Sequence, residues 1–457
     1  MSQEIQLDEL VDGQKFRFFN FNLLFWSFLA ITADGFDLAG LASAAPELAR
    51  AWHIAPHLFA PALSASLFGI LIGAPVLGQL GDRVGRRNSV VAGCFVIGAS
   101  TLATVWATNL NQLLIFRVLT GIGIGGLMPN AIALNSELAP KRLRAMLVVL
   151  MFTGISVGAG IPGAIQAWLI PRHGWQIMFW IGGVAPIIIA ACSFLFLPES
   201  VKFLALRPER RKELLKTARE LRRDLPIADD AQFAAAPAAS GSQVKQIFAG
   251  GLKWVTPILW VCFASALMAN FFLSSWLPLI LEGSGLTPKE SGIATSLYHY
   301  GGVVGALLVS VVLGRYGFRV IAGLYLCAVL GIAAIGIPGL TYAAMAAMVT
   351  LSGFSVVGAQ FGNTGASGLL YPTAYRSTGI GWALGMGRFG SITGPLVGGL
   401  LIGLNVPRQQ FFLVAALPMI AGLIASLCIA RLCFKNLGGA HLDEMGTMAP
   451  PQPANQR

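Results

Sequence analysis

Two aspartates, Asp34 and Asp37, are one helical turn apart within an apolar run from Phe21 to Ala44. A carboxylate at bilayer depth costs roughly 2.5–3.5 kcal/mol on insertion scales, so a pair of them is expected to serve a function. Residues three apart lie on the same face of a helix. The spacing therefore predicts that both carboxyl groups line a polar path or exchange protons.

Arg117 is the cation best placed to meet these aspartates. It lies in another long apolar run, and counting along antiparallel helices at about 1.5 Å per residue puts it at a similar depth. Its guanidinium would stabilise one carboxylate as an ion, while the second carboxyl group, one turn from a like charge, would tend to hold a proton. We therefore expect a proton-coupling site at Asp34, Asp37 and Arg117, with Glu137 near the cytoplasmic end of the same run as Arg117. The alternative for Arg117 is a purely structural ion pair.

Arg388 lies near mid-depth in an apolar run from Gly379 to Leu404, and the second half of the sequence offers it no embedded acidic neighbour. A guanidinium in that position favours an anion, and its planar fork binds a carboxylate through two parallel hydrogen bonds. The alternative is a gate residue that pairs with an acid in a loop. His299, beside Tyr300, could supply a second donor to the ligand, or it could equally be an interior histidine.

Four further side chains are polar or aromatic groups suited to contacts with a ring and its hydroxyl substituents. They are Asn270, Trp276, Gln360 and Asn363. Trp276 lies near the outer end of its run, where it could instead belong to the aromatic belt at the membrane surface.

The composition predicts a polytopic membrane protein. Of 457 residues, 55% are hydrophobic and only 11% are charged, against about 25% charged in an ordinary soluble domain. The first 20 residues have neither the basic region nor the cleavage site of a secretory signal, so the first run should stay as an anchor. The six cysteines fall within apolar runs and show no metal-ligand spacing, and no nucleotide-binding loop or catalytic cluster occurs. We expect no metal, no cofactor and no enzymatic activity.

Windows of about 20 residues predict an all-α membrane protein with twelve membrane-spanning helices. Their limits are Phe21 to Ala44, Phe59 to Leu80, Ser89 to Ala107, Gln112 to Leu134, Ala145 to Leu169, Trp175 to Leu197, Val255 to Leu281, Ser291 to Leu313, Val320 to Ile337, Tyr342 to Ala366, Gly379 to Leu404 and Phe411 to Phe434. Lys and Arg of the short loops fall mostly in alternate connections, so the positive-inside rule places both termini in the cytoplasm. The net charge of +11 then reflects topology and implies no nucleic-acid partner.

The chain is expected to form two six-helix halves around one long polar segment. The predicted division is a cytoplasmic tail at 1–20, a bundle at 21–198, a cytoplasmic loop at 199–253, a bundle at 254–434 and a cytoplasmic tail at 435–457. The loop should hold a surface helix at 210–224 and act as a solvated connector. Short motifs at Leu80 and Ala139 recur loosely at Leu313 and Tyr371, at offsets of 233 and 232 residues. Two matches at nearly one offset indicate a duplicated unit.

The stretch G-Q-L-G-D-R-V-G-R-R fits the pattern G-x-x-x-D-R-x-G-R-R at every fixed position. It resembles the loop between the second and third spans of major facilitator transporters. The resemblance implies that an aspartate of this loop meets a helix N-terminus and basic neighbours and holds the cytoplasmic side shut. With the repeat copy included, the implied gating residues are Gly78, Asp82, Arg83, Gly85, Arg86, Arg87 and Arg376. The alternative, a basic turn that only sets topology, leaves the aspartate unexplained.

Three further stretches resemble the same superfamily. They are Arg117 with Gly121, Gly123 and Gly125, then Pro198-Glu199-Ser200, and the glycine-rich stretch from Gly390 to Gly399. Asp34-Gly35-Phe36-Asp37 resembles the D-G-x-D signature of its aromatic-acid/proton symporters. The resemblance implies a secondary transporter that imports an aromatic carboxylate of the benzoate or hydroxybenzoate class with protons, by alternating access.

The resemblance further implies a bacterial inner-membrane location, with protons, a small aromatic carboxylate and the lipid bilayer as partners, and function as a monomer. Moving a monoanion into an inside-negative cell costs about 2.3 kcal/mol per 100 mV, which a co-transported proton cancels. One alternative is a proton-coupled antiporter that exports drugs or metabolites. A membrane sensor is a third possibility, but the chain has no sizeable soluble output domain.

Overall fold

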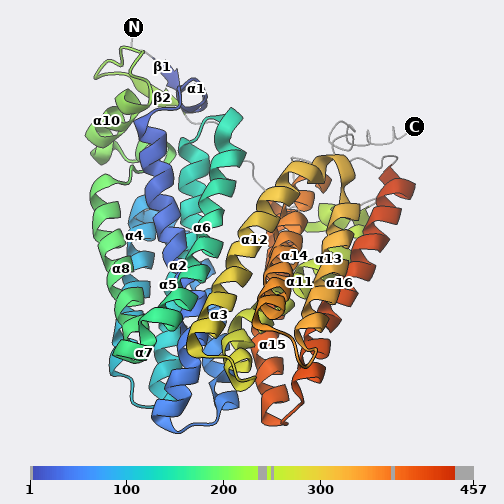
Figure 1. The fold of residues 1–457 in the computed structure, drawn as a ribbon. Coiled ribbons are helices and arrows are strands. Elements are labelled where there is room, and N and C mark those ends of the chain that lie inside the picture. The colour runs from blue at the N-terminus through green and yellow to red at the C-terminus, as the bar shows by residue number, and fades with distance from the viewer. Residues whose placement is uncertain (1–3, 235–243, 249–251, 372–375, 438–457) are drawn as a thin grey trace. The chain divides into compact units, whose positions relative to one another are not determined.

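A computed structural model describes residues 4–234, 244–248, 252–371 and 376–437, which form helices and one pair of short strands (Figure 1). Contacts divide the chain into two compact units, one made of residues 1–240 and 281–296, the other of residues 241–280 and 297–457. The predicted domain limits differ from these units in residues 281–296.

The first part of the chain comprises, in order, β1 (Glu4–Gln6), α1 (Leu7–Asp12), α2 (Phe18–Trp52), the 3-10 helix η1 (Pro56–Phe59), α3 (Ala60–Val84), α4 (Arg86–Ala103), η2 (Thr104–Trp106), α5 (Leu110–Leu138), α6 (Lys141–Trp168), α7 (Ile170–His173), α8 (Gln176–Phe196), α9 (Val201–Ala205), η3 (Pro208–Arg210), α10 (Arg211–Leu221) and β2 (Gln232–Ala234). The remainder comprises η4 (Val244–Phe248), α11 (Leu252–Gly283), α12 (Pro288–Tyr316), α13 (Phe318–Ile335), α14 (Tyr342–Leu370), α15 (Arg376–Gly403) and α16 (Arg408–Leu437).

Within the described residues, eleven helices are long and apolar enough to cross a membrane. They match eleven of the twelve predicted spans. The remaining predicted span is α15, which is 28 residues long but carries Arg388 and many glycines, and these lower its hydropathy. With α15 included, the long helices form the two groups of six that the sequence predicts.

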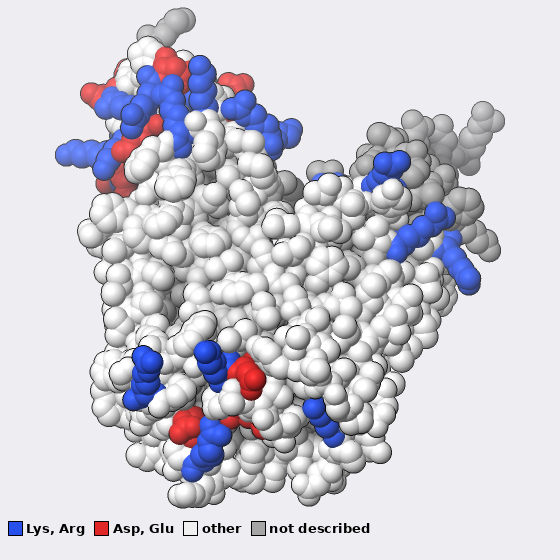
Figure 2. Space-filling model, in the orientation of Figure 1, with Lys and Arg blue, Asp and Glu red and all other residues white. Residues whose placement is uncertain are grey.

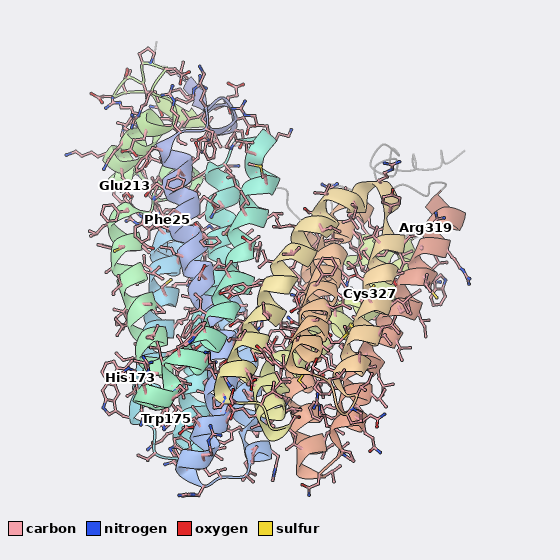
Figure 3. The ribbon with its side chains drawn as sticks, viewed as in Figure 1. Phe25, His173, Trp175, Glu213, Arg319 and Cys327 are labelled. Atoms are coloured by element: carbon pink, nitrogen blue, oxygen red, sulfur yellow. The ribbon has the colours of Figure 1, made fainter. Side chains whose placement is uncertain are left out.

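In unit 1, α2 packs on α6, α3 on α5, and α4 on both α5 and α8. An apolar cluster extends from Phe36, in the middle of α2, to Trp175 and Phe179 at one end of this unit. Figure 3 shows Trp175 and His173 at this end and Glu213 at the other. The indole of Trp175 meets that of Trp52 edge to face, with 5.8 Å between the ring centroids.

Helix α2 is longer than the predicted span, which ended at Ala44. The helix continues through Pro46 to Trp52, because Leu48 and Ala49 are buried in the apolar cluster. It ends at His53, which adopts the left-handed conformation. As a result, the two aspartates lie near the middle of α2.

The opposite end of unit 1, formed by α1, α9, α10, β1 and β2 and here called the polar end, is a folded layer. β1 pairs in parallel with β2, with Ile5 opposite Phe233. Figure 2 shows Lys, Arg, Asp and Glu gathered at this end; fewer charged residues lie near the opposite end, and the band between the two ends carries other residues in this view. Helix α10 confirms the predicted surface helix and buries Leu214, Leu215 and Leu221 on one face.

Hydrogen bonds fasten the amino-terminal segment to this layer. Gln14 donates to the carbonyl of Leu138 at 2.8 Å and accepts from Asn20 at 2.7 Å. Asp12 accepts from the backbone N–H of Lys141 at 2.8 Å. The described part of the central segment up to Ala234 belongs to unit 1 and buries apolar side chains such as Leu214 and Leu221, so it is packed more closely than the predicted solvated connector. Residues 235–243 lie outside the described residues.

In unit 2, α13 packs on both α14 and α16. The turn between α12 and α13 contains Gly317, at φ +55°, one residue before the position that the 233-residue offset pairs with Gly85, which lies between α3 and α4 of unit 1 at φ +108°. Figure 3 labels Arg319 just after this turn. The second repeated motif begins at Tyr371, and its following residues 372–375 lie outside the described residues.

Candidate functional site

Each residue of the Asp34-Gly35-Phe36-Asp37 motif has a different neighbour in unit 1. Gly35 lies against α6, where an added Cβ would stand 2.0 Å from the carbonyl oxygen of Ile155, so only glycine allows the two helices to approach this closely. Phe36 packs against Gly182 in α8. The tight packing on both sides fixes the direction in which the two aspartates point.

Asp37 forms a bidentate ion pair with Arg117 of α5. The two terminal nitrogens of the guanidinium donate to Oδ1 at 2.6 Å and to Oδ2 at 2.7 Å, and one of them also donates to the Asp37 carbonyl at 3.1 Å. Thr101 of α4 adds a hydrogen bond to Oδ1 at 3.1 Å. The side chains of Asp37 and Arg117 are only 2% and 3% exposed. The buried pair and Thr101 thus join α2, α4 and α5. The contact between Asp37 and Arg117 is the one expected from their similar depth in the membrane.

Asp34 is completely buried, at 0% exposure. It lies one turn before Asp37 on α2 and close enough to Cys94 of α4 to interact with it electrostatically. Both terminal nitrogens of Arg117 go to Asp37, so the two carboxyl groups have different surroundings. A charged pair and a second carboxyl group therefore lie side by side in an apolar interior.

Glu137 does not belong to this group. It is twenty residues further along α5 than Arg117, which corresponds to about 30 Å of helix. Its carboxylate instead accepts a hydrogen bond from Ser200 and lies 3.6 Å from Nε of Arg86. The structure therefore places Glu137 at the polar end, and its assignment to proton coupling loses its geometric basis.

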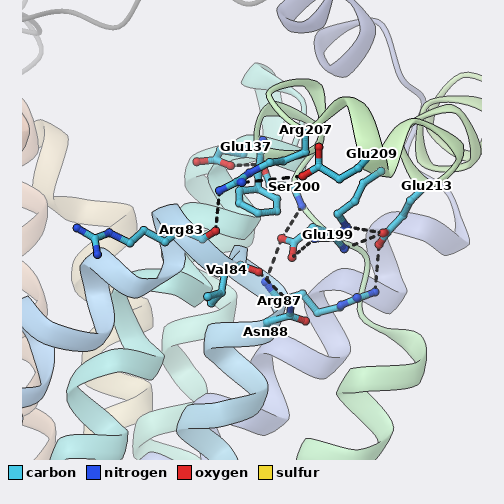
Figure 4. A network of polar contacts seen from close by, with 12 residues as sticks. Arg83, Val84, Arg87, Asn88, Glu137, Glu199, Ser200, Arg207, Glu209 and Glu213 are labelled. Carbon is cyan, nitrogen blue, oxygen red and sulfur yellow. Dashed lines mark hydrogen bonds and ion pairs between the residues drawn. The ribbon is translucent and has the colours of Figure 1, made fainter.

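The polar end holds a second set of charges, here called the polar cluster; Figure 4 shows part of it, with Arg87, Glu137, Glu199, Ser200 and Glu213 labelled. Its members are Asp82, Arg86, Arg87, Glu137, Glu199, Ser200, Arg210 and Glu213. Asp82 pairs with Arg86 at 2.5 Å and is 64% exposed. Arg87 reaches Glu213 at 3.3 Å. The cluster ties the loop between α3 and α4 to α5, α9 and α10.

Glu199 is the buried centre of the polar cluster. Its Oε1 accepts from the backbone N–H groups of Arg87 at 3.1 Å and Ser200 at 2.9 Å. Arg210 lies 4.0 Å from Oε2. Burial raises the pKa of this carboxyl group, and the two backbone hydrogen bonds and the nearby guanidinium groups oppose the rise.

The other predicted gating residues have different positions. Gly78 lies within α3 and has open space where a Cβ would stand. Arg83 is exposed, and its carbonyl accepts from Arg207 at 2.9 Å. In unit 2, Arg376 begins α15 and donates to the carbonyl of Tyr371 at 3.1 Å.

In unit 2, two of the predicted ligand residues touch. Nδ2 of Asn270 in α11 donates to Oε1 of Gln360 in α14 at 3.1 Å. The hydroxyl group of Tyr298 in α12 donates to Oδ1 of Asn270 at 3.0 Å. Asn270 and Gln360 are both partly exposed.

Two predicted ligand residues are used for packing instead. The indole N–H of Trp276 donates to the carbonyl of Pro395 at 2.8 Å, and the ring is 1% exposed, so it belongs neither to a surface belt nor to an open site. Asn363 is buried and donates to the hydroxyl of Tyr325, which in turn donates to the carbonyl of Cys262. Both side chains join helices of unit 2.

The remaining predicted ligand residues lie on α12 and α15. His299 is buried edge-on to Tyr298, with 5.1 Å between the ring centroids, and its Nε2 has no hydrogen-bond partner among the described residues. Tyr300 is 40% exposed. Arg388 is half-buried on α15, between Gly387 and Gly390, which lie against α11.

Comparison with known proteins assigns the family. The model of the major facilitator superfamily matches residues 27–367. The chain belongs to the major facilitator superfamily. The chain is 36% identical to the 4-hydroxybenzoate transporter PcaK of Acinetobacter baylyi, over 87% of this chain and 88% of that protein. It is 32% identical to a gallate transporter of Pseudomonas putida, over 93% and 94%.

A solved structure of another transporter shares the fold. The xylose transporter XylE from E. coli, in a partially occluded inward-open conformation, aligns with a TM-score of 0.67 at 15% identity, covering 90% of this chain and 97% of that one. The chain is thus a multi-pass membrane protein of a transporter family.

Four residues that take part in these groups of contacts carry no recognisable signal in the sequence. Glu213 and Arg210 have the charge pattern of any surface helix, and Thr101 is one hydroxyl in an apolar run, so neither pattern reveals a partner. Tyr298 adjoins His299 in the sequence, which gives no sign of its hydrogen bond to Asn270. Glu199 and Ser200, in contrast, lie in the Pro198-Glu199-Ser200 stretch that resembles the superfamily.

Proposed function

We propose that this protein imports an aromatic carboxylate of the benzoate or hydroxybenzoate class together with protons, by alternating access. The observation that carries the proposal is the buried pair of Asp37 and Arg117 with a second carboxyl group, Asp34, one turn away. Relatives of the chain that are named as 4-hydroxybenzoate and gallate transporters support the class of substrate.

In this proposal, Asp37 and Asp34 have different roles. Asp37 stays ionised because Arg117 holds both of its oxygens. Asp34 is the group that binds and releases the proton, since a second charge beside Asp37 in an apolar interior is costly. A proton carried by Asp34 would cancel the charge of a carboxylate substrate that enters an inside-negative cell.

The proposed carboxylate ligand is Arg388 of unit 2. It is half-buried in a membrane-spanning helix, and a guanidinium binds a carboxylate through two parallel hydrogen bonds. His299 and Tyr300 are proposed as further contacts. The partner of the His299 Nε2 atom would then come from the ligand.

The proposed orientation places the polar end in the cytoplasm. The connections at that end carry Arg83, Arg86, Arg87, Lys141 and Arg142, as expected for loops inside a bacterial inner membrane. Both termini would then be cytoplasmic. Because one chain contains both six-helix units, we propose that it works as a monomer.

Uptake into proteoliposomes of the purified protein tests the proposal. Labelled 4-hydroxybenzoate should accumulate when the outside is more acidic, accumulation should fall as external pH rises from about 6 to 8, and a protonophore should abolish it. Unlabelled benzoate and gallate should compete, whereas an aliphatic acid and an organic cation should not.

Two results would contradict the proposal. Accumulation that follows a sodium gradient and ignores a protonophore would remove the proton from the mechanism. Substrate that leaves the vesicles as protons enter would establish the antiporter instead.

A further inference from the structure

Three side chains of unit 2 form a hydrogen-bond chain with one possible direction. Tyr298 is 1% exposed, so its hydroxyl proton needs an acceptor within the protein. Oδ1 of Asn270, at 3.0 Å, is the acceptor that it has among the described residues. The carbonyl end of the Asn270 amide therefore faces Tyr298.

The orientation of Asn270 then sets that of Gln360. With Oδ1 turned toward Tyr298, the NH₂ group of Asn270 faces Gln360 and donates to its Oε1 at 3.1 Å. The carbonyl of Gln360 is thereby used. Its Nε2 group makes no hydrogen bond within the described part of the chain, and the side chain is partly exposed.

The hydrogen-bond chain therefore fixes the Gln360 Nε2 group as a donor, through Asn270 and Tyr298. A free glutamine amide can present either its oxygen or its NH₂ group to a ligand. Here the buried hydroxyl of Tyr298 removes that choice. The three residues come from α12, α11 and α14, so the helix packing of unit 2 holds the chain in place.

We propose that Gln360 donates a hydrogen bond to an oxygen substituent on the substrate ring, and that Tyr298 is a positioning residue that acts through Asn270 to select such substrates. This inference rests on the proposed function, in which the substrate is an aromatic carboxylate. It adds the feature of the ring that is recognised: a hydroxyl oxygen is preferred over a bare ring and over a substituent that is mainly a donor.

Binding to purified full-length protein tests the inference with three ligands: 4-hydroxybenzoate, benzoate and 4-aminobenzoate, whose amino group is a donor and a poor acceptor. The wild type should bind 4-hydroxybenzoate about 3- to 10-fold more tightly than the other two, the worth of one net hydrogen bond. Gln360→Leu should remove this preference while benzoate affinity stays within about twofold. Gln360→Glu replaces the donor by an acceptor, to which a ring hydroxyl or a ring amino group can donate, so 4-aminobenzoate should gain affinity relative to benzoate.

Tyr298→Phe separates positioning from packing, because it keeps the ring and removes only the hydroxyl group. It should reduce the preference for 4-hydroxybenzoate, and adding it to Gln360→Leu should cause no further loss, since Tyr298 acts through Gln360. The matched control is Tyr325→Phe, which removes another buried tyrosine hydroxyl of unit 2 that donates to the Cys262 carbonyl. This control should lower stability and leave the ligand preference unchanged.

The outcomes distinguish the two proposals. A wild type that binds none of the three ligands contradicts the proposed function. A wild type that binds all three equally, or a Gln360→Leu variant that keeps the wild-type preference, overturns the inference alone. Equal loss of preference in Tyr325→Phe and Tyr298→Phe would also overturn it, because the effect would then come from general loosening of unit 2.

Discussion

Oε2 of Glu199 lies 2.1 Å from the point where a Cβ on Gly85 would stand. The backbone of Gly85, at φ +108° and ψ 151°, is in a region that is essentially restricted to glycine. The loop between α3 and α4 can therefore approach a buried carboxylate only if this position has no side chain. Both this contact and the backbone conformation of the turn therefore require glycine at position 85.

Gly85→Ala should lower the free energy of unfolding by about 1–3 kcal/mol, from backbone strain and displacement of Glu199. Thermal and denaturant unfolding in detergent would measure the loss. Gly78→Ala is the matched control: it changes another glycine of the same motif, in a helix and with open space around it, so it should be neutral or stabilise by up to about 1 kcal/mol. Equal effects of the two changes would show that the contact with Glu199 is unimportant.

Glu199→Gln should remove a pH dependence of stability. Burial raises the pKa of Glu199 above 4.5 in the folded protein, so the unfolded chain loses this proton first as pH rises. Between the unfolded and the folded pKa of Glu199, the folded state binds more protons than the unfolded state. The contribution of Glu199 to stability therefore falls as pH rises through the folded pKa. Unfolding of wild type and variant between about pH 4 and 7 should show the wild type losing stability relative to Glu199→Gln. Parallel curves would contradict the raised pKa.

Asp37→Asn and Arg117→Gln should each destabilise the protein by about 3–5 kcal/mol, because each leaves one buried charge without its partner. The double variant should recover much of this loss, since no buried charge remains. Unfolding of the two single variants and the double variant would give the coupling energy. Simple addition of the two single effects would show that the ion pair contributes little.

Asp34→Asn should abolish accumulation driven by a proton gradient and keep exchange of labelled for unlabelled substrate, since a permanently neutral side chain resembles the protonated carboxyl group. Proteoliposome uptake and exchange would be measured side by side. Thr101→Val is the control: it removes a neutral hydrogen-bond partner of Asp37 and should retain proton-driven accumulation. Accumulation by Asp34→Asn at the wild-type level would move proton coupling elsewhere.

Arg388→Lys keeps the charge and loses the planar fork, so the apparent affinity for the aromatic carboxylate should weaken by roughly 1–3 kcal/mol. Arg117→Gln should leave equilibrium binding nearly intact and shift the pH profile of uptake. Binding to purified protein together with uptake would separate the two roles. Normal binding by Arg388→Lys and lost binding by Arg117→Gln would place the carboxylate site in unit 1.

Local features of the sequence were sufficient for the class of protein and for the pair of embedded charges. Hydropathy over windows of helix length predicted the long helices, because a bilayer requires each span to be apolar along its own length. The cost of burying a carboxylate singled out Asp34 and Asp37 without reference to any neighbour. The motif of Gly78 to Arg87 predicted the family.

The tertiary structure decided which groups meet. Glu137 and Arg117 lie on the same helix, α5, but far apart along its axis. They therefore meet different partners, Arg86 and Asp37. Trp276 and Asn363 look like ligand residues in sequence, yet the indole N–H of Trp276 donates to the Pro395 carbonyl and the Nδ2 group of Asn363 donates to the Tyr325 hydroxyl. Such pairings join residues that are far apart in the chain, so the periodicity of one segment holds no information about them.

Pairings between distant segments also form the polar end and set the direction of the Gln360 amide. The amino-terminal segment pairs with β2 across more than two hundred residues, and its short polar sequence gives no sign of a partner. The donor at Gln360 depends on Tyr298 and Asn270, from two other helices. Sequence determined which residues can carry charge or hydrogen bonds in this membrane protein, and only the packing of its helices determined where each of those bonds goes.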